Sequence, residues 1–246
     1  MVRRTLLVGL VPRSGLLQQR AFPVGNISHL TIGFIDLCEC NRKTAHQDSR
    51  HMRTSQRSGR TDIRITLPRW VHGVLRRCTP CRTDEDKMRL VITLARENVE
   101  RETGGPFAAA IFQQPGNRPV AVGVNRVEPL RNAVLHAEII ALMLAETRLR
   151  SHTLRAPRLP AHELITSCAP CAMCLGAALW SGVRRIVCGA GRADAVALGF
   201  EEGPVFPASY RYLKARGIEV VHGVLADEAR TVFEAYRQRC GRIYNG

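Results

Sequence analysis

The sequence has no long apolar run, few acidic residues and no regular cysteine spacing, and each of these features excludes a class of protein. No apolar stretch approaches the roughly 20 residues that a membrane-spanning helix needs. The opening stretch, MVRRTLLVGLVP, lacks a convincing apolar core and a small-residue cleavage site, so we do not expect a signal peptide. The nine cysteines are odd in number and irregularly spaced, which argues against a disulfide framework and favours a reducing, cytoplasmic environment.

Acidic residues are outnumbered, because 21 Asp and Glu stand against 36 Lys and Arg and leave a net charge of +15. Residues 1–60 carry ten basic and three acidic residues, whereas the remaining three quarters of the chain carry 26 and 18. A basic surplus can indicate nucleic-acid binding. Most of these residues are arginine, as GC-rich coding would give, and this explains the charge at least as well. We therefore do not expect a nucleic-acid partner.

The chain divides into two parts of different character. The stretch 41–60 is polar and basic and has no helical or strand periodicity, which is typical of disorder. We predict a basic, disordered N-terminal extension over residues 1–62 and one folded domain over residues 63–246. A start of translation at Met52 is an alternative, and a chain that begins there should keep its activity.

The folded part alternates helical and strand patterns. Asp84 is a plausible cap of the first helix, and a Pro-Gly-Asn turn separates the first two strands. The predicted elements are helix 83–102, strands 107–112 and 119–124, helix 136–146, strand 162–167, helix 170–180, strand 184–189, helix 210–216, strand 218–223 and helix 226–239. Five strands between helices predict an α/β sandwich.

Two predicted helix starts carry the side chains of a catalytic zinc site. HAE supplies His136 and Glu138, and PCAMC supplies Pro170, Cys171 and Cys174. Cysteines three apart lie on one face of a helix, and a helix N-terminus favours thiolates. One histidine and two thiolates leave the fourth position of tetrahedral zinc open, as in catalytic sites. Glu138 can then carry protons without being a ligand.

Three other cysteines, two methionines and one tryptophan are expected to have structural roles and not to bind metal. Cys78 and Cys81 form a CTPC pair without a second pair nearby, so we do not expect them to bind metal. Cys168 is expected to pack at the end of a strand beside the ligands. We expect core packing for Met143 and Met173. For Trp180 we favour core packing over a position near the site or at a dimer interface.

Several motifs together resemble a known family. They are GGPFAAAIF (104–112), NRVEP (125–129), HAEIIAL (136–142), TSCAPCAMCLGA (166–177), GFEEGP (199–204) and GRIYN (241–245). The order H-x-E…P-C-x-x-C is the signature of zinc deaminases. Residues 63–246 resemble the cytidine-deaminase-like superfamily, specifically its bacterial guanine deaminase branch, which includes enzymes that accept ammeline. The resemblance implies a three-layer α/β/α sandwich with a five-stranded mixed sheet, and one zinc ion per subunit.

The resemblance also implies roles for residues outside the zinc site. Asn125 would hydrogen-bond the base, and Phe107 would form an apolar wall beside it. Glu202, next to Glu201, would be a second proton carrier near the exocyclic amine. The C-terminal tail would close the pocket of the partner subunit in a domain-swapped homodimer, which makes Tyr244 a candidate lid residue.

The implied reaction is hydrolytic deamination of guanine to xanthine and ammonia. Zinc-activated hydroxide would attack C2, Glu138 would shuttle the proton, and Glu202 would help protonate the leaving amine. One departure is Ala169, where many family members have Glu, which leaves the hydrogen bonding of the pocket rim open. The alternatives are a deaminase of ammeline, cytosine or tRNA adenosine, or a non-catalytic, zinc-stabilised RNA-binding module. The mixed charge of helix 226–239 and the presence of Glu138 and Glu202 argue against the last two.

Overall fold

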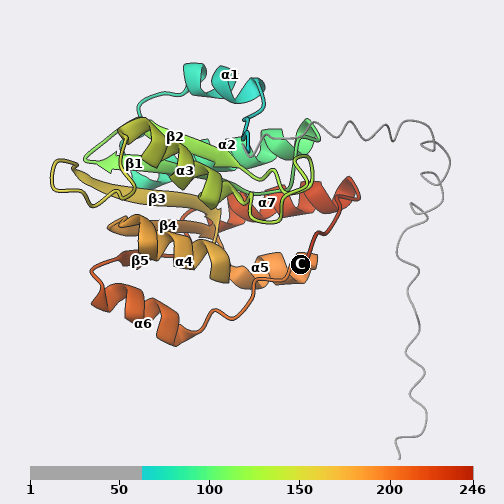
Figure 1. Cartoon of the computed structure of the whole chain (residues 1–246). Helices are drawn as coiled ribbons and strands as arrows, with labels where there is room; N and C mark the ends of the chain where they lie inside the picture. The colour runs from blue at the N-terminus through green and yellow to red at the C-terminus, as the bar shows by residue number, and fades with distance from the viewer. Residues whose placement is uncertain (1–62, 246) are drawn as a thin grey trace, which may run out of the picture. The chain divides into compact units, whose positions relative to one another are not determined.

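The structure is a computed structural model that describes residues 63–245 (Figure 1). The predicted extension over residues 1–62 lies outside the described residues. The elements in chain order are α1 (Trp70–Arg77), α2 (Asp84–Glu100), β1 (Ala108–Gln114), β2 (Pro119–Val124), α3 (Ala137–Leu149), β3 (Ala161–Cys168), α4 (Ala172–Ser181), β4 (Arg185–Ala190), α5 (Arg192–Leu198), α6 (Pro207–Ala215), β5 (Glu219–Val221) and α7 (Ala226–Gln238). Every predicted element is present, β5 is shorter than predicted, and the sequence patterns missed α1 and α5.

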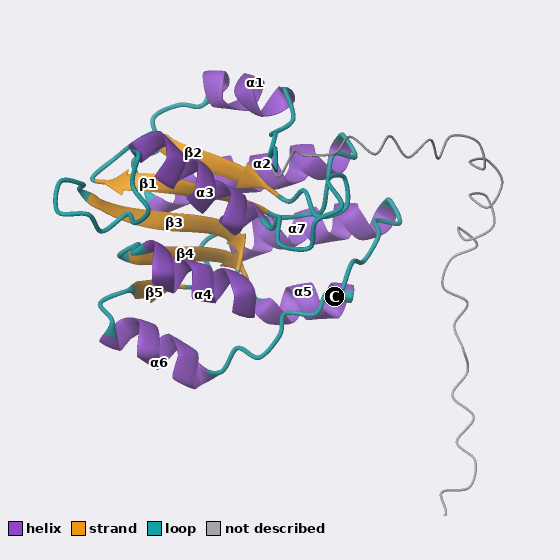
Figure 2. Ribbon diagram, viewed as in Figure 1, coloured by secondary structure: helices purple, strands orange, loops and turns teal. Residues whose placement is uncertain are grey.

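The five strands form one mixed sheet in the order β2-β1-β3-β4-β5. Strand β1 pairs antiparallel with β2 and β3, whereas β3, β4 and β5 run parallel. Helices α2 and α7 pack on one face, and α3 and α4 cover the other (Figure 2). The expected three-layer α/β/α sandwich with a five-stranded mixed sheet is confirmed.

The central strands are buried on both faces. In β1, Ala108, Ala110 and Phe112 face the α2 and α7 layer, and Ala109 and Ile111 face the α3 and α4 layer. Strand side chains alternate between faces, so two separate apolar cores form, one on each side of the sheet. Both faces of the sheet are therefore covered by packed helices, and the loops at the strand ends are left to build a site.

Close packing brings the start of α3 down onto the sheet. A Cβ at Gly123 of β2 would lie 2.1 Å from the carbonyl oxygen of Ala137 and 2.7 Å from the amide nitrogen of Ala141. A side chain at position 123 would therefore collide with the α3 backbone, so glycine is required for this approach. This contact helps to fix the N-terminal end of α3, where His136 and Glu138 lie.

Helix α2 begins with a capping box at Thr83, not with a cap at Asp84 as the sequence suggested. The Thr83 hydroxyl accepts a hydrogen bond from the Asp86 amide, and the Asp86 carboxylate accepts one from the Thr83 amide. Asp84 instead receives two hydrogen bonds from the Arg185 guanidinium, at 2.8 and 2.6 Å. The ion pair ties the start of α2 to the start of β4.

The structure contradicts the core predictions for Met143 and Trp180, and Met173 is only partly buried. Trp180 is 82% exposed and Met143 is 44% exposed, so neither packs in the core. Helical periodicity places both on the outer sides of their helices, which the sequence pattern of an almost wholly apolar helix does not reveal. No helix within residues 63–245 is long and apolar enough to cross a membrane.

Candidate zinc centre

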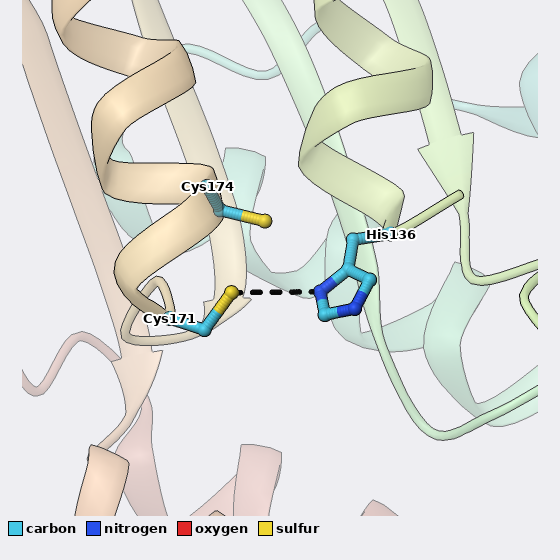
Figure 3. A group of neighbouring side chains, drawn as sticks. All are labelled: His136, Cys171 and Cys174. Atoms are coloured by element: carbon cyan, nitrogen blue, oxygen red, sulfur yellow. Dashed lines mark hydrogen bonds between the residues drawn. The ribbon is translucent and has the colours of Figure 1, made fainter. Parts of the chain in front are cut away.

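Three metal-ligand side chains meet where α3 and α4 begin. His136 is the N-cap of α3, Cys171 is the N-cap of α4, and Cys174 lies in the first turn of α4. Figure 3 shows the imidazole turned toward the two thiols, with 3.6 Å between His136 Nδ1 and Cys171 Sγ. The ligand atoms of all three lie within 4.8 Å of one another. The predicted ligand set is therefore brought together by two helix starts.

The chemistry of this cluster suits zinc. The pKa of the Cys171 thiol is lowered to about 4. The hydrogen bond from Cys174 is the largest cause, and the hydrogen bond with His136 also lowers this pKa, whereas burial raises it. A thiol that ionises this readily is ready to bind a metal ion. One imidazole nitrogen and two sulfurs match the donors that zinc takes in sites with an open fourth position.

Glu138 lies against the ligands from the first turn of α3. Its side chain is buried, and burial raises the pKa of its carboxyl. Oε1 accepts a hydrogen bond of 2.8 Å from the Thr166 hydroxyl, and Oε2 lies 3.4 Å from Cys174 Sγ. The carboxyl is thus placed beside the metal site, with Oε1 engaged by Thr166 and Oε2 facing Cys174.

A cavity of about 250 Å³ opens above this cluster. The predicted residues Phe107, His136, Glu138, Cys171, Glu202 and Tyr244 all line it, together with Val127, Ala133, Cys168, Ala169, Met173, Phe200, Glu201 and Asn245. Cys174 is buried beside the other two ligands and is not among the lining residues. The cavity is large enough for one bicyclic base and has both apolar walls and carboxylates.

Glu202 reaches the cavity from the loop that follows α5. Burial, followed by the neighbouring Cys171 and Glu138 charges, raises the pKa of Glu202 to about 8. The Arg192 guanidinium donates to the carbonyl oxygens of Gly203 and Val205, at 2.8 and 2.9 Å, and so holds this loop. A carboxyl with such a pKa can hold a proton near neutral pH.

Aromatic side chains form one wall of the cavity. The ring centroids of Phe107 and Phe200 are 5.0 Å apart, and those of Phe200 and Tyr244 are also 5.0 Å apart, both edge to face. Tyr244 belongs to the C-terminal tail and reaches the cavity of its own chain. Asn245 ties this tail to the Glu202 loop, because its side chain accepts from the Glu201 amide and donates to the Gly199 carbonyl.

Two buried polar atoms beside the cavity have no hydrogen-bond partner within residues 63–245, namely Asn125 Nδ2 and the Tyr244 hydroxyl. Asn125 is only 1% exposed and does not itself line the cavity, but its backbone amide donates to the Phe107 carbonyl, at 3.0 Å. Its Oδ1 accepts from the Val127 amide, which leaves the amino group free. Buried groups of this kind cost free energy unless a ligand satisfies them.

The sequence missed four residues of this site. Thr166 contacts Glu138, and Arg192 holds the Glu202 loop. Phe200 belongs to the aromatic wall, and Asn245 ties the tail to the Glu202 loop. Thr166, Phe200 and Asn245 lie inside the TSCAPCAMCLGA, GFEEGP and GRIYN motifs, which is the signal that could have found them. Cys168 packs at the end of β3, as predicted, with its thiol 3.5 Å from the Gly191 carbonyl oxygen.

Comparisons with known proteins agree with this site. Residues 81–190 match the cytidine and deoxycytidylate deaminase zinc-binding region. The chain is 31% identical over 153 residues to guanine deaminase of Bacillus subtilis (strain 168), which covers 62% of this chain and 93% of that protein. The solved structure of guanine deaminase from Nitrosomonas europaea is 41% identical with a TM-score of 0.69, over 73% of this chain and 98% of that chain. Another solved relative, in complex with 2,6-diaminopurine, is 43% identical with a TM-score of 0.69, over 74% of this chain and 96% of that chain.

The chain belongs to the cytidine and deoxycytidylate deaminase family of zinc proteins. Guanine deaminases from two bacteria are among its relatives, which confirms the family and the branch that the motifs indicated.

Proposed function

We propose that this chain is a zinc-dependent guanine deaminase that hydrolyses guanine to xanthine and ammonia. The observation that carries the proposal is the convergence of the His136, Cys171 and Cys174 cluster with two buried carboxyls, Glu138 and Glu202, on one cavity. A structural zinc site requires neither carboxyl. The guanine deaminases among the relatives support this substrate.

The residues of the cavity divide the proton transfers between them. Zinc, when held by the three ligands, supplies a Lewis acid that lowers the pKa of water to about 7. Glu138 takes a proton from the attacking water and delivers it to a ring nitrogen, acting first as general base and then as general acid. Glu202 gives a proton to the departing amine and takes one back from the oxygen at C2 as that oxygen becomes a carbonyl of xanthine. Water adds its oxygen at C2, the C2–N bond breaks, and xanthine and ammonia are left.

The base would be oriented by the polar atoms beside the cavity that have no hydrogen-bond partner among the described residues. The free amino group of Asn125 is a donor, and guanine offers acceptors in its carbonyl oxygen and ring nitrogens. The ring would lie against Phe107 and Tyr244, which exclude water from the reacting edge. Correct placement of C2 supplies much of the acceleration, because reacting atoms must approach within about 3–3.5 Å.

We further propose that two copies form a homodimer through the outer faces of α3 and α4 and exchange their C-terminal tails. Met143 of α3 and Trp180 of α4 are 44% and 82% exposed, and Val134, in the loop before α3, is 49% exposed. Exchange would place Tyr244 in the partner's pocket. A mixture of Glu138→Gln and Tyr244→Ala chains, unfolded and refolded together, should regain activity, whereas chains that keep their own tails should not.

Two further expectations belong to this proposal. We place the enzyme in the cytoplasm, where a reducing environment suits the seven described cysteines, which form no disulfide. We also propose that residues 1–62 are an extension separate from the catalytic domain. A chain that starts at Met52 should therefore keep its zinc content and its turnover number.

The test of the function is ammonia release from purified protein with guanine, ammeline, 2,6-diaminopurine, cytosine, adenine and their nucleosides. Release from guanine with the highest kcat/KM is the expected result. Glu138→Gln should keep zinc and lose nearly all release from every base. Release from another base without release from guanine would contradict the proposed substrate.

A further inference from the structure

Thr166 is a buried hydroxyl in an otherwise apolar part of the sheet. It lies on β3, opposite Ala109 of β1 and Cys188 of β4, and is 1% exposed. Leu164, two residues earlier on the same face of β3, is part of the apolar core under α3 and α4. A hydroxyl in such surroundings costs free energy unless it is hydrogen-bonded. The role of Thr166 therefore depends on which group its hydroxyl binds.

The Thr166 hydroxyl has two acceptors within reach. Oγ1 is 2.8 Å from Glu138 Oε1 and 3.0 Å from the Cys168 carbonyl oxygen. A hydroxyl has one proton, so it donates to one acceptor at a time. The carboxylate is the stronger acceptor because charge-assisted hydrogen bonds are shorter and stronger than neutral ones. The shorter of the two distances is the one to Glu138.

Among the described side chains, Cys174 is the other neighbour that could donate to Glu138, at 3.4 Å. A cysteine that binds zinc does so as a thiolate, which has no proton to give. The Glu138 backbone amide also contacts the carboxyl, but it belongs to the same residue. Among the described residues, Thr166 is then the one other side chain whose hydrogen bond can fix the orientation of the Glu138 carboxyl when zinc is bound.

We infer that Thr166 is a positioning residue for Glu138. Its hydroxyl holds Oε1 against β3, so that Oε2 is the oxygen turned toward the ligands and left free for proton transfer. Thr166 is neither a member of the ligand cluster nor a lining residue of the cavity, and it acts only through the direction of the carboxyl. This inference rests on the proposed function, in which Glu138 carries the proton.

The test compares two substitutions at one position. Thr166→Val keeps the branched shape and removes the hydroxyl, whereas Thr166→Ser keeps the hydroxyl and removes the methyl. We expect Thr166→Val to lower kcat by about 10- to 100-fold with little change in KM and full zinc content, because misplacement of a reacting group costs rate at this scale. Thr166→Ser should keep kcat within about 3-fold of wild type.

The matched control is Thr153→Val. The Thr153 hydroxyl donates to the Ser181 carbonyl at 3.2 Å and is partly buried, but it lies outside the cavity. This variant should lose some thermal stability and keep kcat. In a Glu138→Gln background, Thr166→Val should cause no further loss, since the carboxylate that it orients is gone. If Thr166→Val is too unstable to purify, Thr166→Ala removes the same hydroxyl and gives the same comparison.

Several results would overturn the inference. They are a Thr166→Val enzyme with unchanged kcat, a Thr166→Ser enzyme as slow as the valine variant, or a rate loss that follows lost zinc. Failure of the proposed function would be recognised separately, because wild-type protein would then release no ammonia from guanine.

Discussion

A methyl group at Gly105 should displace the tail that closes the cavity. Gly105 lies in the loop between α2 and β1, and a Cβ there would be 2.1 Å from the Tyr244 hydroxyl oxygen and 2.9 Å from Tyr244 Cζ. Ordinary contacts of a Cβ begin near 3.4 Å, so the Tyr244 ring must move by more than 1 Å. The ring also packs edge to face against Phe200, with 5.0 Å between the ring centroids, and this contact restricts its rotation.

Two effects of Gly105→Ala follow from this displacement. Overpacking of a well-filled site typically costs about 1–3 kcal/mol, so Tm should fall by several degrees. Misplacement of binding groups by about 1 Å can cost as much as ~100-fold in rate, so kcat/KM for guanine should fall by about 10- to 100-fold. Zinc content should be unchanged, because the three ligands lie on α3 and α4. Ammonia release, metal analysis and a thermal melt measure the three quantities.

The control for this prediction is Gly73→Ala on α1. A Cβ at Gly73 would meet only Arg77 Nη1, at 3.5 Å, which is an ordinary contact with a flexible side chain. This variant should match or exceed wild type in Tm and match it in activity. In a Tyr244→Ala background, Gly105→Ala should have no additional effect. Wild-type kcat/KM in Gly105→Ala would refute the placement of Tyr244 in the pocket.

Three further predictions concern the carboxyl groups and their supports. Glu138→Gln should bind zinc normally and lower kcat by about 10²- to 10⁴-fold, the range of general acid–base catalysis; a loss of zinc instead would make Glu138 a structural group. Arg192→Met should release the Glu202 loop from its two carbonyl contacts. We expect a clear fall in kcat, measured by ammonia release, with only a small change in Tm, measured by a thermal melt. Hydrogen bonds from Arg185 lower the pKa of Asp84, so the folded state favours its carboxylate. That stabilisation is complete above the pKa of the unfolded chain and disappears as the pH falls through the folded-state pKa. Asp84→Asn should therefore lower stability by up to about 1 kcal/mol at neutral pH and have little effect near pH 2. An equal loss at both pH values would contradict the ion pair as its cause.

The zinc ligands were predictable because each depends on local spacing. Cys171 and Cys174 are three residues apart on a helix, and their meeting requires only that α4 forms. His136 and Glu138 open an apolar helix whose pattern is equally clear. The alternation of strands and helices predicted the layers in the same way, since each element buries one or both faces according to its own period.

Other features of the site depend on contacts between segments that are far apart in the sequence, and local sequence patterns do not predict such contacts. Thr166 looks like any strand threonine, and only the register of β3 between β1 and β4 places its hydroxyl against Glu138. Thr83 caps α2 through its local pairing with Asp86, whereas the role of Asp84 depends on Arg185, about a hundred residues away in the sequence. The exposure of Trp180 was decided by which side of α4 faces the sheet. The sequence by itself therefore determined the chemistry of the zinc centre, and the tertiary structure decided which side chains orient, close and flank it, because those roles arise from contacts between distant segments.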